Sequence, residues 1–192
     1  MTNKNPIDIF VVIHEDINPS TKQQMAASYF SHLQKELESF TDRKVNIFYG
    51  TGSPHNKFDY KGSNETEILQ RWEKLGLQWL EFRSKEGFII TQTSLVLLFT
   101  AHPINENVSG AALVDLRKNG GRFAIASAGS NLYPAHEIGH LLGAKHDDYE
   151  VNYDGWWCET YMTPNPHLLR SNCYKYSPAN RNAIKHYLAS MD

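Results

Sequence analysis

The pattern of apolar and polar positions predicts a strand, a helix and a second strand at the start of the chain. Residues 7–13 are apolar on both sides apart from Asp8, which is typical of a strand covered on both faces. A capping box at 20–23 and apolar residues at helical spacing predict a helix next: Met25, Tyr29, Leu33, Leu37 and Phe40. Apolar positions then alternate over 45–49. This region therefore predicts a parallel strand, helix, strand unit.

The middle of the chain continues this alternation. Residues 50–62 are rich in Gly, Ser, Pro and Asn and predict a loop. Asn64 then caps a predicted helix with these apolar positions: Ile68, Leu69, Trp72, Leu75, Trp79 and Leu80. Three more strands are predicted at 94–100, 111–115 and 123–127, and the short one after Gly110 is typical of a sheet edge. Five strands with helices between them indicate an α/β fold.

Composition limits the partners. A chain of 192 residues with 41% hydrophobic content fits one globular domain, 1–192. The net charge of -2 gives no basic excess, so we expect neither nucleic acid nor an anionic membrane as a partner. The longest strongly apolar run, 95–99, is far shorter than the roughly 20 residues of a membrane span. Polar residues 1–5 do not resemble a signal peptide, which indicates either a mature form or a protein that acts where it is made.

A cluster of histidines supplies the candidate chemistry. His136 and His140 are four residues apart, so on a helix both imidazoles project from one face and can share a cation. Glu137 is offset by about 100° and suits a general base that acts on water rather than a ligand. Gly143 can end the helix in the left-handed conformation and turn the chain, so that His146 becomes a third ligand. A chance pattern on an ordinary amphipathic helix is the alternative, and the fixed spacing of Gly143 and His146 makes it rare.

Residues 136–146 match every fixed position of His-Glu-x-x-His-x-x-Gly-x-x-His, the long motif of the metzincin zinc proteases, which this chain resembles. The acidic Asp147 after the third histidine resembles the adamalysin or reprolysin branch. The resemblance implies a mixed five-stranded twisted sheet with an antiparallel edge strand, two long helices and an active-site helix. It also implies an N-terminal subdomain of about 1–143 and a small C-terminal subdomain of about 144–192 that ends in a helix.

The resemblance also implies roles for residues on both sides of the zinc motif. The edge strand formed by Gly110, Ala111, Ala112, Leu113 and Val114 resembles the strand along which an extended substrate lies antiparallel, using the unpaired N–H and C=O groups of a sheet edge. A plain edge strand is the alternative.

Met162 resembles the Met-turn beneath the zinc, and Thr163 and Pro164 resemble the wall of the S1' pocket, which receives the side chain after the scissile bond. Three residues separate Cys158 from Met162 here, whereas the family usually has one.

The two cysteines and an acidic segment leave alternatives open. From the number of cysteines alone, Cys158 and Cys173 could equally be two buried free thiols or a disulfide. The resemblance implies a disulfide, and hence an oxidising, extracellular location. Residues 147–157 form an acidic and aromatic predicted loop. A calcium site there is not supported, because the spacing matches no known calcium loop, and a solvated surface is favoured.

The predicted function is a zinc-dependent endopeptidase. Three histidines leave the fourth zinc position open for a water, which the metal activates near neutral pH while Glu137 takes its proton and returns it to the leaving amine. The expected partner is a protein or peptide substrate, bound by a secreted monomer. One alternative is a catalytically silent module that retains zinc and binds a partner. The other is an effector or toxin protease that acts inside a target cell, where both cysteines would be free.

Overall fold

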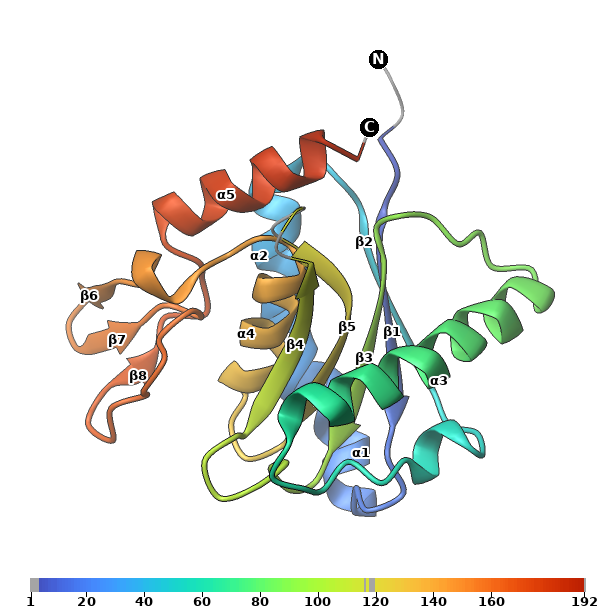
Figure 1. The fold of residues 1–192 in the computed structure, drawn as a ribbon. Helices are drawn as coiled ribbons and strands as arrows, with labels where there is room; N and C mark the ends of the chain where they lie inside the picture. Colours follow the sequence, from blue (N-terminus) through green and yellow to red (C-terminus); the bar gives the residue numbers. More distant parts are fainter. Residues whose placement is uncertain (1–3, 116, 118–119, 192) are drawn as a thin grey trace.

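The structure, a computed structural model, describes residues 4–115, 117 and 120–191, and its centre is a five-stranded sheet (Figure 1). The strands are β1 (Ile7–Ile13), β2 (Val45–Gly50), β3 (Ser94–Thr100), β4 (Gly110–Asp115) and β5 (Gly120–Ser127). Their order is β2-β1-β3-β5-β4; β4 pairs antiparallel with β5, and the other pairs are parallel. The predicted mixed sheet with an antiparallel edge strand is therefore confirmed.

Strand β5 begins three residues earlier than the apolar pattern predicts. Gly120 and Gly121 pair with Asp115 and Val114 after a register shift in β4. A Cβ on Gly121 would lie 1.9 Å from the carbonyl oxygen of Leu113, so only glycine fits this close approach. Glycine weakens the strand pattern in the sequence, which explains why the prediction starts late.

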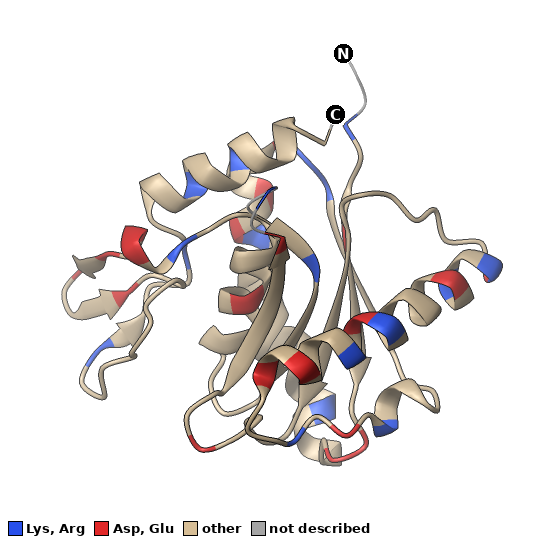
Figure 2. Ribbon diagram, in the orientation of Figure 1, with Lys and Arg blue, Asp and Glu red and all other residues tan. Residues whose placement is uncertain are grey.

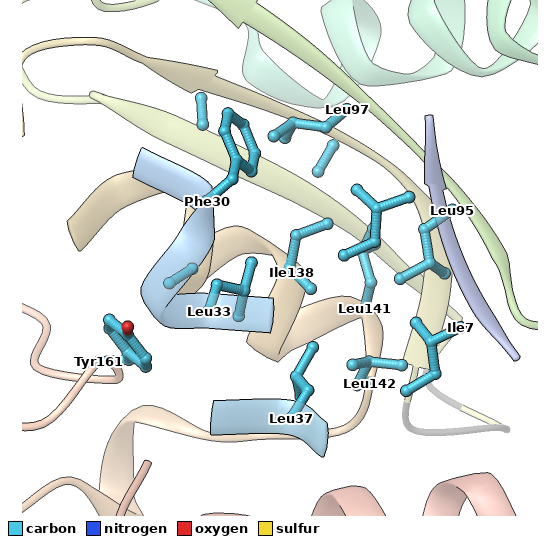
Figure 3. Close-up of a cluster of buried hydrophobic side chains, with 14 of the residues drawn as sticks. Ile7, Phe30, Leu33, Leu37, Leu95, Leu97, Ile138, Leu141, Leu142 and Tyr161 are labelled. Carbon is cyan, nitrogen blue, oxygen red and sulfur yellow. The ribbon is translucent and has the colours of Figure 1, made fainter. Parts of the chain in front are cut away.

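Helices cover both faces of the sheet. One face packs against α1 (Pro19–Met25), the π-helical turn η1 (Ala26–Phe30), α2 (Ser31–Thr41) and α4 (Leu132–Leu141), forming the larger apolar cluster (Figure 3). The other face packs against α3 (Glu65–Lys85), whose Trp72 and Trp79 are buried as predicted. Neighbouring residues of β1 and β3 alternate between these two clusters, and both strands are buried along their whole length.

The first long helix begins differently from the prediction. The capping box predicted at 20–23 is wrong, because the N-cap is Asn18, whose side chain accepts a hydrogen bond of 2.8 Å from the Thr21 N–H. Pro19 occupies the first helical position, where its fixed φ and missing N–H are tolerated. The predicted cap of α3 is confirmed, since Asn64 accepts a hydrogen bond from the Glu67 N–H.

The chain after α4 forms a small lobe beside the sheet (Figure 1). It contains the 3-10 turn η3 (His146–Asp148), a second sheet of β6 (Val151–Tyr153), β7 (Trp157–Glu159) and β8 (Ser171–Asn172), and the closing helix α5 (Pro178–Ala189). The loop predicted at 147–157 is wrong in part: it folds as a hairpin, with its turn at Gly155 in the left-handed conformation. The predicted loop at 50–62 likewise contains a short 3-10 turn, η2 (His55–Lys57).

A disulfide joins Cys158 in β7 to Cys173, directly after β8. Within the described ranges, none of the helices has the length and apolar character needed to cross a bilayer. The outer ends of the predicted domain, residues 1–3 and 192, lie outside the described residues.

Candidate metal centre and active site

Helix α4 holds two of the three histidines in a fixed relation. The Leu132 N–H, at the start of the helix, donates to the Ser130 hydroxyl at 3.2 Å. Ile138 and Leu141 have no exposed surface and pack into the larger apolar cluster. His136 and His140 lie one turn apart on the opposite side of these anchors. The core thereby fixes the position of both imidazoles.

The Nε2 atoms of His136, His140 and His146 converge on one point. The pairs are 2.8 Å apart for His136 and His146, 3.0 Å for His140 and His146, and 3.2 Å for His136 and His140. Tetrahedral coordination with zinc–nitrogen bonds of about 2.0–2.1 Å would place them roughly 3.3 Å apart. The three Nε2–Nε2 distances are slightly shorter than this value, and the three atoms form the same triangle as the ligands of a tetrahedral zinc site.

The tautomers of two of these rings follow from their outer hydrogen bonds. His136 Nδ1 donates to the Tyr161 carbonyl at 2.8 Å, and His140 Nδ1 donates to the Ala144 carbonyl at 3.2 Å. Since a carbonyl oxygen only accepts, both Nδ1 atoms carry hydrogen. Burial, together with neighbouring histidines, lowers the pKa of His136 to about 3 and that of His140 to about 4. Both rings are therefore neutral near pH 7 and point their Nε2 lone pairs at the same point.

This donor set fits a metal ion. Lone pairs that face one another with no hydrogen between them repel unless a cation lies among them. Among the residues that the structure describes, these three histidines form the group able to hold a metal, with one donor atom each and all atoms within 4.8 Å of one another. These are the same three residues that the sequence predicts as metal ligands.

The turn after α4 delivers His146. Gly143 has a φ of 92°, the left-handed conformation expected for a residue that ends the helix. The backbone of Lys145 is held on both sides by Asn180, which accepts from the Lys145 N–H at 2.7 Å and donates to its carbonyl at 3.1 Å. Asn180 has no exposed surface. A buried amide in α5 thus fixes the residue before the third histidine.

Glu137 lies beside the histidines without joining their group. Its carboxyl is buried, and burial first, then the negative charge of Glu65, raises its pKa to about 8. A Cβ on Gly110 would lie 2.6 Å from Glu137 Oε1. The carboxyl therefore touches the first residue of the edge strand, and glycine at 110 leaves room for it.

The wider spacing between Cys158 and Met162 is taken up by buried residues. Glu159, Thr160 and Tyr161 are exposed by 3% or less, and the Tyr161 carbonyl is the one that binds His136. Met162 is fully buried against α4, since a Cβ on Gly139 would lie 2.5 Å from its sulfur. These residues form a support under α4.

The edge strand and the segment after Met162 border the histidines. Gly110, Ala111, Ala112, Leu113 and Val114 pair only with β5, which leaves the other side of β4 as the sheet edge in the described chain. Thr163 and Pro164 line a cavity of about 370 Å³ with Gly110, His136, Glu137, His146 and Glu65, here called the Glu65 cavity.

A second cavity of about 320 Å³, here called the Val114 cavity, is lined by Val114, His140, Gly143, His146 and Asp147. A larger cavity, of about 460 Å³, is lined by residues such as Arg122 and Tyr187 and by none of the three histidines. The histidine centre therefore opens onto the two smaller cavities.

Sequence reasoning missed three contributors to this site. The Tyr161 carbonyl is a backbone group that any residue could supply. No motif in the sequence singles out Asn180, and its bridging role appears only when the fold buries its amide beside Lys145. Glu65 lies in the first turn of α3, and no spacing in the sequence relates it to the three histidines.

Comparisons with known proteins agree with this geometry at the level of fold. No protein-family model matches the chain, and no curated protein matches it. Among solved structures, metalloproteinase-II from Bacteroides fragilis superposes with a TM-score of 0.66 at 17% sequence identity. The chain therefore shares its fold with that protein. The match covers 96% of this chain and 53% of that one, so the chain spans about half the length of the protein it matches.

Proposed function

We propose that the chain is a zinc-dependent endopeptidase of the metzincin type, most similar to the adamalysin or reprolysin branch. The observation that carries the proposal is the convergence of three imidazole Nε2 atoms beside a buried carboxyl, at the start of a free sheet edge. The full eleven-residue motif and the following Asp147 support the family assignment. Zinc is the ion that three neutral imidazoles favour in such a site.

The edge strand binds the substrate backbone in this proposal. An extended peptide adds to β4 as a further antiparallel strand, so its N–H and C=O groups pair with those that β5 leaves free. Because β4 runs from Gly110 to Val114, the antiparallel peptide runs from the Val114 cavity toward the Glu65 cavity. The residue after the scissile bond therefore enters the Glu65 cavity, next to Thr163 and Pro164.

Glu137 moves the proton during hydrolysis. His136, His140 and His146 would hold the zinc ion, which when bound would lower the pKa of a water to about 7 and polarise the carbonyl of the scissile bond. The Glu137 carboxylate accepts a proton from the attacking water as its oxygen bonds to the carbonyl carbon. It then gives that proton to the amide nitrogen as the carbon–nitrogen bond breaks.

The disulfide supports a location outside the reducing cytosol. Bridges such as Cys158–Cys173 persist mainly in oxidising compartments, so we propose a secreted protein that acts as a monomer on protein or peptide substrates. An effector that acts inside a target cell would have its two thiols reduced there.

Metal analysis and one matched variant test the function. Purified protein should carry about one zinc per chain, measured by mass spectrometry of the metal. Glu137→Ala should keep that zinc and lose at least about a thousandfold in cleavage rate. Cleavage by Glu137→Ala at the wild-type rate would overturn the assignment. Zinc bound by both forms with cleavage by neither would indicate the silent binding module instead.

A further inference from the structure

The Glu65 cavity carries an acidic group that the hydrolytic reaction does not use. Its walls are largely apolar or uncharged, with Val108, Leu132, Pro164 and Pro166 among them. Glu65 contributes a carboxyl from the first turn of α3. Among the described residues that line the cavity there is no lysine or arginine. The cavity therefore combines apolar and uncharged polar lining residues with an acidic group that no basic lining residue balances.

Glu65 is free to meet a ligand. It is exposed, and within the described part of the chain it forms no ion pair or side-chain hydrogen bond. Acidic positions are seen at the start of α3 (Figure 2). Its neighbour Glu67 lies in the same first turn but does not line the cavity. Both glutamates can stabilise the N-terminus of α3 by their negative charge. Only Glu65 also lines the cavity.

We propose that Glu65 selects a lysine or arginine side chain at the substrate position that occupies this cavity, on the C-terminal side of the scissile bond. The inference rests on the proposed function. A lysine or arginine buries its aliphatic stem along apolar surface and keeps its charged end near an acid, which matches the two kinds of wall. An acidic substrate residue would meet both Glu65 and Glu137 and is disfavoured.

Matched peptides test this selection on the zinc-loaded protein. Cleavage-site profiling of a proteome digest first identifies a peptide that is cut. Variants of it then carry Lys, Arg, Met or Glu after the scissile bond, and kcat/KM is measured for each. Wild type should favour Lys and Arg over Met, with Glu the poorest. Raising the salt from about 0.05 to 0.5 M should reduce the preference, because Glu65 is exposed and screened.

Two variants assign the preference to one residue. Because Glu65 also acts on the pKa of Glu137, the diagnostic quantity is the ratio of kcat/KM for the Lys peptide to kcat/KM for the Met peptide. Glu65→Gln should lower this ratio about fivefold, as expected for loss of an exposed charge pair. Glu67→Gln removes the same charge from the same helix turn and should leave both values unchanged. Glu65→Lys should favour the Glu peptide over the Lys peptide.

Distinct outcomes separate this inference from the proposed function. Wild-type preference for Met or Glu, or equal effects of Glu65→Gln and Glu67→Gln, would overturn the selection by Glu65 and leave the protease intact. No cleavage of any peptide by the zinc-loaded wild type, or equal cleavage by Glu137→Ala, would overturn the proposed function and this inference with it.

Discussion

The two parts of the molecule that supply the histidines are stabilised by different means. His136 and His140 belong to a helix whose inner residues are fully buried in the apolar core of the sheet. His146 follows a glycine turn and leads into a lobe whose strands have two or three residues each. Trp156 in that lobe is 62% exposed. The helical pair is therefore positioned by apolar burial of its own helix. The residue before the third histidine is instead held by the Asn180 side chain, and a covalent bridge joins the short strands that follow.

The largest test of this contrast removes apolar volume from the core. Leu97→Ala, at a position of β3 with no exposed surface, should lower the free energy of unfolding by about 4 kcal/mol through lost burial and a residual cavity. Chemical denaturation of the metal-free protein measures it. Leu77→Ala, half exposed on α3, is the matched control and should cost less than about 0.5 kcal/mol. Similar losses in both variants would contradict a core-stabilised sheet.

The lobe should respond most to loss of its bridge. The disulfide closes a 15-residue separation, so the double variant Cys158→Ser and Cys173→Ser should lose about 3 kcal/mol. Hydrogen exchange should rise in residues 151–173 before it rises in β1 or β3. Equal exchange in the lobe of both proteins would show that the short sheet holds without the bridge.

The third histidine can be tested through its support alone. Asn180→Ala removes both hydrogen bonds to Lys145 and should weaken zinc affinity about ten- to a hundredfold, as other supports of metal ligands do. Competition with a chromophoric chelator measures the affinity. Asn182→Ala, exposed on the same helix, should leave it unchanged. An unchanged affinity in Asn180→Ala would mean that the Gly143 turn suffices to place His146.

A smaller effect is expected where the sheet edge meets the acid. Gly110→Ala places a methyl group within 2.6 Å of Glu137 Oε1, so the carboxyl must shift. We expect kcat to fall about tenfold with zinc content and unfolding midpoint nearly unchanged, because misplacement affects proton transfer rather than the core. Ala111→Gly tests the same edge without added volume. Wild-type kcat in Gly110→Ala would show that Glu137 can relocate freely.

The strands of the sheet were predictable because runs of apolar residues in the sequence mark the buried strands. The ends of β1 and β3 agree with the prediction, since both strands are dominated by apolar residues that are buried on both faces of the sheet. The histidine cluster was predictable because its members lie within eleven residues. The hairpin at 151–159 was missed because its residues are polar and aromatic rather than alternating. Asn180 and Glu65 were missed because only the fold brings them to the site.

One hydrogen bond limits how far the zinc motif can be treated as a portable unit. His136 reaches the Tyr161 carbonyl, 25 residues away and outside the motif. Transplanting residues 136–147 onto another helix would carry the ligands and the acid but leave His136 without the acceptor that sets its tautomer. A protein engineer who wished to graft this centre would need to carry the segment around Tyr161 with it, or design a new carbonyl in its place.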